Sequence, residues 1–486
     1  MPASVAMYSP LIVAVGGIVL YFTITLMPQR LRRWSGTLAA LWLLAVFALL
    51  MSVIIPYAYV PGVPVMGLTG GLLITGIGAL AAYASQGTID PDGPVQLYYP
   101  LFLLALAGAV AIGFASDIFT IFVAVELSAI PVYALCAYRH REDPAALPSA
   151  MKYMMQGIVG TITALFGIAI LYIAGRTLSI PALPAALSSA SQPLVLFAAI
   201  LIVLGYGVKL AIVPLHTWLP DAYARAPAGV TAIMVGATKI GVLIAIFLTL
   251  SALPASPVVS WTLGVIIIGF AVVTMTAGNL LALNQPDIRY VLSYSSVAQM
   301  GYILLGFGIG LVYNLPLGFT AGLYYAIAYG IMKSGSFLAA DAFSRSAGSS
   351  EISRMKGLGA RLPLAGISFT IFVFGLIGVP FTCGFLGKLL LEQAGMVTSM
   401  MSGFVLALIL ALNSAISLGY YVPLLSTLLF GKDTSERTVG RVTRTPASSL
   451  AVVVFLAVIT VYFGLFPESF DWISQAATQI FPWGVT

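Results

Sequence analysis

The segment GYGVKLAIVPLHTWLPDAYARAP, residues 205–227, places a lysine, Lys209, inside the end of a long apolar run. Two prolines, a histidine and an aspartate follow Lys209 within a dozen residues. Proline lacks a backbone donor and clashes with the preceding turn, so Pro214 predicts a broken helix just beyond Lys209. A charge at the centre of a bilayer costs about 2.5–3.5 kcal/mol on insertion scales. The segment therefore predicts a membrane helix whose lysine faces the protein interior.

The composition is that of a polytopic membrane protein. Of the 486 residues, 60% are apolar and 7% are charged, against about 25% charged in soluble domains. Windows of about 20 apolar residues recur along the whole chain. They predict an all-α protein with about fourteen transmembrane helices, whose approximate cores are residues 9–28, 35–55, 65–84, 97–115, 117–138, 151–174, 194–213, 228–250, 258–283, 290–312, 317–340, 363–385, 402–429 and 448–467.

The basic residues predict the orientation of these spans. If the helices alternate in direction, sixteen of the 21 lysines and arginines fall on one side: Arg30, Arg32, Arg33, Arg139, Arg141, Lys152, Arg225, Arg289, Arg345, Arg354, Lys356, Arg361, Lys432, Arg437, Arg441 and Arg444. The positive-inside rule makes that side cytoplasmic, so both termini are expected outside. Arg176 is an exception, and the loop at 85–96 carries only Asp90 and Asp92.

The other four basic residues are lysines inside predicted spans, namely Lys209, Lys239, Lys333 and Lys388, and Glu126 is the only acid near the middle of a span. A buried lysine can lose its proton near neutral pH, whereas arginine stays charged. The pattern therefore predicts a proton relay. The structural alternative, a lysine that pairs with a carbonyl or carboxylate or reaches the interface, carries more weight for Lys333 and Lys388, which lie nearer to span ends.

A second interrupted span precedes Lys388 in GVPFTCGFLGKLLLE, residues 378–392. Two interrupted spans in corresponding places are typical of inverted-repeat transporters. The layout predicts two inverted five-helix repeats, formed by spans 4–8 and 9–13, each with a broken fourth helix. The chain would then divide into residues 1–96, 97–250, 251–430 and 431–486.

Three segments resemble a known family: KLAIVPLHTWLPDAYARAP (209–227), LNQPDIRYVLSYSSVAQMGYILLG (283–306) and GVPFTCGFLGKLLLE (378–392). They resemble the antiporter-like subunits of respiratory complex I, of multisubunit sodium/proton antiporters and of membrane-bound hydrogenases. The N-type subunit of complex I is the most similar, and the D-type antiporter subunit is also similar.

The resemblance implies roles for individual residues. Glu126 matches the family's essential glutamate, Lys209 the lysine that pairs with it, Lys239 the central lysine and Lys388 the terminal lysine. A proton would enter near Glu126 and Lys209, cross through Lys239 and leave by Lys388. His216 matches the histidine of the signature segment, and a hydrogen-bonding role at a helix end is the alternative for it.

The chain departs from the family at two positions in the middle of this path. Family members often carry histidines where this chain has Gln299 and, in the next span, Tyr329. Lys333, one turn after Tyr329, is expected to replace the missing titratable group.

No redox site is expected in the chain itself. Its two cysteines, Cys136 and Cys383, are too few and too far apart for a metal cluster, and GFGIG at 306–310 lies inside a span, where it indicates helix packing. The resemblance implies a proton-translocating subunit of a pump in the plasma membrane, driven by NADH, F420H2, ferredoxin or hydrogenase chemistry. Its partners would be other antiporter-like subunits and a peripheral arm that holds flavin, iron–sulfur clusters or a NiFe centre.

Three alternatives remain open at the level of sequence. The chain could belong to a sodium/proton antiporter without redox partners, act as a stand-alone secondary solute transporter, or be a scaffold with a silent path. The ion could be H⁺ or Na⁺.

Overall fold

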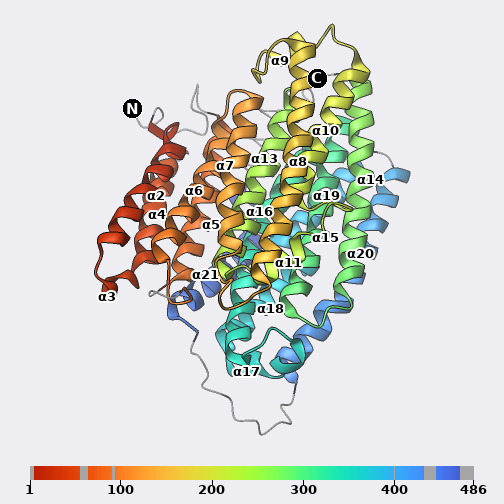
Figure 1. Cartoon of the computed structure of the whole chain (residues 1–486). Coiled ribbons are helices and arrows are strands. Elements are labelled where there is room, and N and C mark those ends of the chain that lie inside the picture. Colours follow the sequence, from red (N-terminus) through yellow and green to blue (C-terminus); the bar gives the residue numbers. More distant parts are fainter. Residues whose placement is uncertain are drawn as a thin grey trace.

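The computed structural model describes residues 5–54, 64–89, 93–254, 256–398, 400–431 and 445–470, and within these ranges the chain is helical with no β-strand (Figure 1). Lys432, Arg437, Arg441, Arg444, Asp90 and Asp92 lie outside the described residues.

Twelve helical segments in the described ranges are long and apolar enough to cross a membrane. One of them, Ala228–Ser251, consists of α12 (Ala228–Ile233), a π-helical turn η1 (Met234–Thr238) and α13 (Lys239–Ser251). The others are α2 (Ser9–Leu26), α4 (Ser35–Ile54), α5 (Val65–Ser85), α6 (Val95–Phe114), α7 (Ile118–Cys136), α8 (Ala146–Gly175), α10 (Gln192–Leu210), α14 (Pro257–Ala282), α15 (Ile288–Tyr313), α20 (Met400–Phe430) and α21 (Ala447–Leu465).

Two further helices fall on the two remaining predicted spans, and a third lies mostly between the predicted spans 363–385 and 402–429. The helix α16 (Pro316–Ala347) has 32 residues but is more polar, while α18 (Pro363–Ile377) has only 15 and is followed by α19 (Cys383–Thr398). The exact count of fourteen spans and the inverted repeat stay predictions. Short helical pieces make up the rest: α3 (Gln29–Arg32), α9 (Leu183–Ala186), α11 (Leu219–Arg225), η2 (Ile352–Met355), α17 (Leu358–Arg361) and η3 (Pro467–Phe470).

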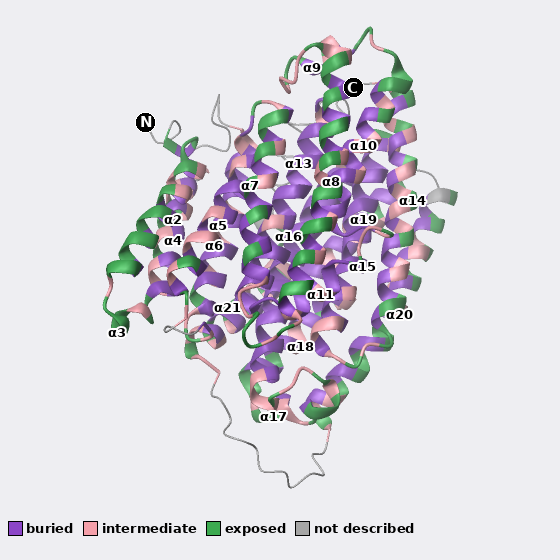
Figure 2. Ribbon diagram, viewed as in Figure 1, coloured by how far each residue is buried: buried purple, intermediate pink, exposed green. Residues whose placement is uncertain are grey.

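The bundle has an interior of buried helices and an apolar outer surface. Nearly all residues of α13 and α15 are buried, whereas α8, α14 and α20 expose one face (Figure 2). On α8 the exposed face is a stripe of Met155, Val159, Ile162, Phe166 and Ile173, each between 57% and 63% exposed. Apolar side chains at helical spacing on the outside of a folded chain indicate a surface in contact with lipid or with another membrane subunit.

Both predicted helix interruptions are confirmed. The helix α10 ends at Leu210, Ala211 adopts a left-handed conformation, and α11 begins at Leu219. Two polar groups of the loop are satisfied within the protein: the Trp218 indole N–H donates to the Val208 carbonyl at 2.8 Å, and the Val213 N–H donates to Thr274 Oγ1 at 3.0 Å. Non-helical backbone at membrane depth requires such internal partners.

The second interruption separates α18 from α19. Gly378 ends α18 with a φ of 98°, a conformation that disfavours any side chain. The Gly378 and Val379 N–H groups both donate to the Phe374 carbonyl, at 2.9 and 2.8 Å. The predicted span 363–385 is therefore too long at its end, because the backbone turns at Gly378.

Arginine-bearing pieces gather at one end of the bundle. The helices α3 and α17, whose last turns carry Arg30, Arg32 and Arg361, lie at the lower end in Figure 1, and α9 lies at the opposite end. This arrangement agrees with the predicted grouping of the basic loops on one side.

Candidate functional site: a row of buried lysines

Glu126 and Lys209 form an ion pair inside the bundle. Lys209 Nζ lies 2.9 Å from Glu126 Oε1, and the two side chains are 4% and 20% exposed. Glu126 comes from α7 and Lys209 from the last turn of α10. Thr161 on α8 donates its hydroxyl to the same carboxylate oxygen at 2.7 Å. Three helices thus hold the predicted pair, and its carboxylate is the more accessible partner.

The end of α10 is a favourable place for a buried ammonium. The last carbonyls of a helix lack intrahelical partners and carry partial negative charge. Tyr133 adds a second contact, with its hydroxyl 3.4 Å from Lys209 Nζ and its ring centroid at 6.0 Å. Lys209 therefore lies in the last turn of α10, directly before the break, where Glu126 and Tyr133 contact its ammonium group.

Lys239 is held differently, by aromatic rings. It is the first residue of α13, directly after the π-helical turn, and it is 2% exposed. Its Nζ lies 5.4 Å from the ring centroid of Tyr223 and 5.7 Å from that of Tyr329, and no described residue accepts a hydrogen bond from it. The hydroxyls of Tyr223 and Tyr329 are also buried without a hydrogen-bond partner in the described part of the chain. A cation between two ring faces is stabilised by cation–π attraction but keeps its donors unused.

Lys333 is the most deeply buried of the four lysines, with 0% exposure. Its position near a span end, expected from sequence, is wrong, because α16 continues to Ala347 and leaves Lys333 close to the middle of that helix. Its Nζ donates to the Leu292 carbonyl at 2.9 Å, to Ser295 Oγ, and to the Tyr421 hydroxyl at 3.3 Å. Three neutral acceptors from α15 and α20 solvate this amine, and no carboxylate among the described residues is paired with it.

Lys388 uses the second helix break. Its Nζ donates to the carbonyl of Ile377, the last residue of α18, at 2.7 Å, and to Ser414 Oγ at 2.9 Å. The ring of Tyr302 on α15 lies 4.7 Å away. Lys209 and Lys388 thus both lie at a helix break, but Lys209 belongs to the helix that ends there and pairs with a carboxylate, whereas Lys388 belongs to the helix that follows and donates to a carbonyl.

Gln299 and Tyr325 occupy the region between Lys333 and Lys388. The Tyr325 hydroxyl donates to Gln299 Oε1, and Gln299 Nε2 donates to the Leu376 carbonyl at 3.4 Å. Gln299 lies one turn beyond the serine that binds Lys333 and one turn before Tyr302, which contacts Lys388. Tyr325 lies two turns before Lys333 on α16. One face of α15 and one of α16 therefore carry a line of polar side chains between the two lysines.

His216 is not joined to this row in the described structure. It lies half-buried in the break between α10 and α11, and its Nδ1 is buried without a hydrogen-bond partner among the described residues. His216, Lys239 and the pair at Lys209 belong to the same part of the chain, but no contact links the imidazole to either lysine.

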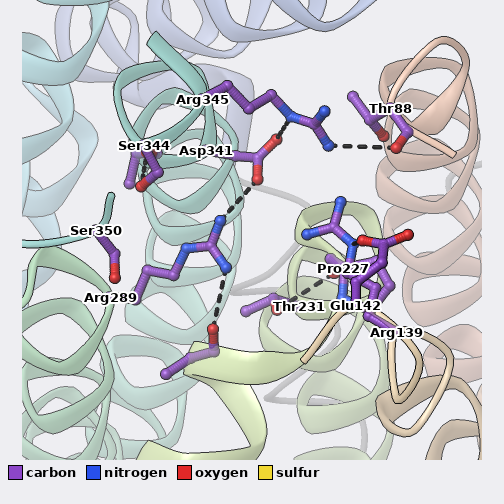
Figure 3. Close-up of polar contacts among 12 residues, drawn as sticks. Thr88, Arg139, Glu142, Pro227, Thr231, Arg289, Asp341, Ser344, Arg345 and Ser350 are labelled. Carbon is purple, nitrogen blue, oxygen red and sulfur yellow. Dashed lines mark hydrogen bonds and ion pairs between the residues drawn. The ribbon is translucent and has the colours of Figure 1, made fainter. Parts of the chain in front are cut away.

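A second buried carboxylate, Asp341, lies at the arginine-rich end of the bundle. Arg289 Nη2 and Arg345 Nε lie 2.8 and 2.6 Å from its two oxygens, and both guanidinium groups point at it from opposite sides (Figure 3). Arg289 also donates to the Ala224 carbonyl of α11 at 3.0 Å, and Arg345 to the Thr88 carbonyl at 3.2 Å. This cluster ties α11 to α15, α16 and the end of α5. Its role in the described structure is to hold helix ends together.

The surroundings of the lysines were not predicted from sequence. Tyr133, Tyr223, Tyr302 and Tyr421 belong to the apolar runs in composition, and nothing in their spacing marks them as neighbours of lysines. Ser295 and Gln299 are four residues apart within one span, a spacing that places them on one helix face. No group of three or more His, Cys, Asp or Glu that could hold a metal ion occurs among the residues that the structure describes.

Comparison with known proteins places this arrangement in a family. The sequence model described as "NADH:quinone oxidoreductase/Mrp antiporter, TM" matches residues 115–417, which include Glu126 and all four buried lysines. The chain belongs to this family. Its segment from the start of α7 to the middle of α20 is therefore the part that the family shares.

Individual relatives cover most of the chain. It is 32% identical over 429 residues to F(420)H(2) dehydrogenase subunit N of Methanosarcina mazei, an alignment that covers 84% of this chain and 82% of that protein. It is 33% identical over 400 residues to NADH-quinone oxidoreductase subunit N of Rhodococcus opacus, which covers 81% of this chain and 71% of the relative.

A solved structure has nearly the same fold from end to end. A chain of the membrane-bound sulfane sulfur reductase, an archaeal respiratory membrane complex, superposes with a TM-score of 0.86 at 25% identity and covers 98% of both chains. The predicted family membership is confirmed, and with it the assignment as a multi-pass membrane protein.

Proposed function

We propose that this chain is a proton-translocating membrane subunit of a complex I-like, redox-driven pump. The observation that carries the proposal is the Glu126–Lys209 ion pair at 2.9 Å, followed by three further buried lysines. Burying four ammonium groups in one bundle is costly, and such groups in membrane helices mark ion pathways. The names of the two relatives, both N subunits of dehydrogenase complexes, support the redox-driven class.

The proposed path runs from the Glu126–Lys209 pair through Lys239 and Lys333 to Lys388. Paired, Glu126 and Lys209 hold each other charged. Separation of the pair by a neighbouring subunit leaves the Lys209 ammonium buried without its counter-ion, which favours release of its proton. The proton passes through water to Lys239 and onward, and a proton that moves against a membrane potential gains about 2.3 kcal/mol per 100 mV.

The tyrosine rings at Lys239 fit such a relay. Cation–π contact stabilises the ammonium form without occupying its three N–H groups, so the proton remains available for transfer. Gln299, which replaces a histidine that the family often has, cannot itself titrate near neutrality. Its hydrogen bonds to Tyr325 and to the Leu376 carbonyl support a role in ordering the path between Lys333 and Lys388. His216 remains a candidate at the entrance, because its Nδ1 is free to bind a water or a substrate proton.

The electron-transfer chemistry would belong to partner subunits. We propose other antiporter-like membrane subunits and a peripheral arm with flavin, iron–sulfur clusters or a NiFe centre as the partners. The complex would lie in the plasma membrane, with the arginine-rich end of the bundle in the cytoplasm and both termini outside. The family description includes Mrp antiporters, so a sodium/proton exchanger without redox partners is the second candidate.

The test of the proposal begins with isolation of the native complex in mild detergent and identification of its subunits by mass spectrometry. Iron–sulfur, flavin or hydrogenase subunits are expected, and their identity would show which electron donor the complex uses. Antiporter-like subunits alone would instead identify a sodium/proton exchanger.

The relay is then tested by Lys209→Ala in the intact complex. Donor-driven proton uptake into inverted membrane vesicles should fall to background, while the assembled complex keeps its subunits. Lys356→Ala is the matched control, since Lys356 is an exposed lysine outside the row. Proton uptake that is equal in the two variants would rule out the relay through Lys209.

A further inference from the structure

An open cavity lies at the arginine-rich end of the bundle, away from the lysine row. Its volume is about 480 Å³, against about 30 Å³ for one water molecule in the liquid. Residues at the α3–α4 junction, at the end of α5, on α6 and at the start of α21 line it, among them Arg32, Arg33, Trp34, Gln86 and Tyr99. The cavity thus joins the α2–α4 hairpin to the rest of the bundle.

The charge of this cavity is positive and uncompensated within the described structure. Arg32 reaches only backbone carbonyls, those of Met27 and Thr25, at 3.4 and 3.5 Å. The Arg33 guanidinium carbon lies 5.7 Å from the centroid of the Trp34 ring. Neither arginine forms an ion pair with a described residue, and no acidic side chain is among the described residues that line the cavity. Two guanidinium groups with no counter-ion among the described residues favour an anionic occupant.

Two neutral donors in the same cavity also lack partners in the described part of the chain. Tyr99 is 2% exposed, yet its hydroxyl makes no hydrogen bond to a described residue. The Gln86 carbonyl oxygen accepts both the N–H of Thr37, at 2.7 Å, and the Thr37 hydroxyl, which assigns the other end of that side chain as the amide donor. No described residue accepts from the Gln86 NH₂ group. Both groups are therefore available to donate to an anion in the cavity.

The cavity lies at the level where lipid headgroups meet water. The apolar helices α2, α4, α5, α6 and α21 all begin or end there. Trp34 and Tyr83 are 47% and 37% exposed at its rim, as aromatic residues of membrane interfaces are. Farther along α4, Leu41 and Leu44 expose apolar surface. An anion that arrives here with its own hydrocarbon chains satisfies the arginines and this apolar surface together.

We propose that this cavity binds the phosphodiester headgroup of an anionic glycerophospholipid. The phosphate accepts from Arg32, Arg33, Tyr99 and Gln86, and the acyl chains lie along α4. Phosphatidylcholine has the same phosphodiester, but its ammonium group would find no carboxylate among the described lining residues. Basic pockets between membrane helices are suited to anionic headgroups. The bound lipid holds the α2–α4 hairpin against α5, α6 and α21, a role independent of the lysine relay.

The binding is tested with the full chain, purified in mild detergent and titrated with phosphatidylglycerol, by native mass spectrometry. Arg32→Gln/Arg33→Gln should weaken retention of the lipid about tenfold, as expected for the loss of hydrogen bonds to a charged group. Tyr99→Phe removes one buried donor without changing charge and should weaken retention about threefold. This second variant keeps the test decisive if the arginine double variant does not fold.

The control is Arg30→Gln/Arg141→Gln, which removes the same charge from two exposed arginines that do not line the cavity. It should retain phosphatidylglycerol as the wild type does. Equal loss in the control and in the cavity variant would overturn the proposal, as would equal retention of phosphatidylcholine. Displacement of the lipid by millimolar inorganic phosphate would assign the cavity to free phosphate and overturn the lipid assignment.

Discussion

Lys209 Nζ meets Glu126 Oε1 at 2.9 Å where α10 breaks off, so the cation of the pair is also the last charged group of a half-helix. At the second break a lysine of the following helix, Lys388 on α19, donates to the last carbonyl of α18 at 2.7 Å. At the second break the ammonium satisfies a helix-end carbonyl, and at the first break it is offset by the carboxylate of Glu126. Each break thus places a buried ammonium group beside a polar partner inside the bundle.

The effects of substituting Glu126 and Lys209 on the stability of the protein should be non-additive. Glu126→Gln leaves an almost fully buried ammonium without its counter-ion, and Lys209→Met leaves a partly exposed carboxylate. Each single variant should lower the thermal unfolding midpoint, whereas the double variant should recover part of the loss, with a coupling energy of about 1–3 kcal/mol. Thermal unfolding of the four proteins in detergent measures this cycle. Losses that simply add would show that the ion pair contributes nothing beyond its separate side chains.

Tyr329 separates two explanations of how Lys239 is held. If the ring supplies the contact, Tyr329→Phe should keep donor-driven proton uptake within about twofold of wild type, and Tyr329→Leu should reduce it about tenfold or more. If the hydroxyl carries the path through water, the phenylalanine variant should fail as well. Proton uptake by inverted vesicles, at matched amounts of assembled complex, distinguishes these outcomes.

Gly378 should be required for the position of Lys388. Its φ of 98° is unfavourable for alanine, and an added Cβ would lie 3.0 Å from Lys388 Cδ. Gly378→Ala should therefore displace the amine from the Ile377 carbonyl and reduce proton uptake. Gly348 is the matched control, since its φ is 65° and nothing lies within 4 Å of an added Cβ.

Both glycine variants should lose about 1–2 kcal/mol of stability from the left-handed backbone alone. Only the Gly378 variant should lose proton uptake as well. A similar loss in Gly348→Ala would attribute the effect to stability rather than to the lysine.

Asp341 should be among the most stabilising polar residues of the described structure. Its carboxylate is 4% exposed and paired with Arg289 and Arg345 (Figure 3). Asp341→Ala leaves the Arg289 guanidinium, which is 17% exposed, without its carboxylate partner, which predicts a loss of about 3–5 kcal/mol. Glu351→Ala, which removes an exposed pair with Arg354 at 3.6 Å, should cost less than about 1 kcal/mol. Thermal unfolding of both variants checks the difference, and equal shifts would contradict the assigned role of Asp341.

Much of the fold could be predicted because each membrane helix is recognisable from a local run of about 20 apolar residues. The predicted core 65–84 corresponds to α5 at Val65–Ser85, and the core 317–340 lies within α16 at Pro316–Ala347. The errors lie at the ends. The span predicted at 363–385 stops at Ile377, because a left-handed glycine ends the helix where hydropathy alone would continue it.

The candidate site was predictable in its charges and unpredictable in its contacts. The sequence predicted Lys333 as a buried amine, but its depth within the bundle could not be predicted. Its three acceptors, Leu292, Ser295 and Tyr421, belong to two other helices, which pack against α16 only in the folded protein. The cavity at Arg32 and Arg33 gave no sequence signal either. In the sequence these arginines are simply charges in a loop. Only the fold shows that Tyr99 and Gln86 line the same cavity.

The sequence by itself therefore determined the class of protein, the broken helices and the residues that carry charge into the membrane. Each of these follows from the free energy of placing single residues in hydrocarbon, and that energy depends on residue type and near neighbours. Only the tertiary structure decided that Lys239 lies between two tyrosine rings and that Lys333 donates to Leu292, Ser295 and Tyr421. Those contacts depend on how separate helices pack against one another, and side-chain packing between distant segments leaves no periodic mark on the sequence.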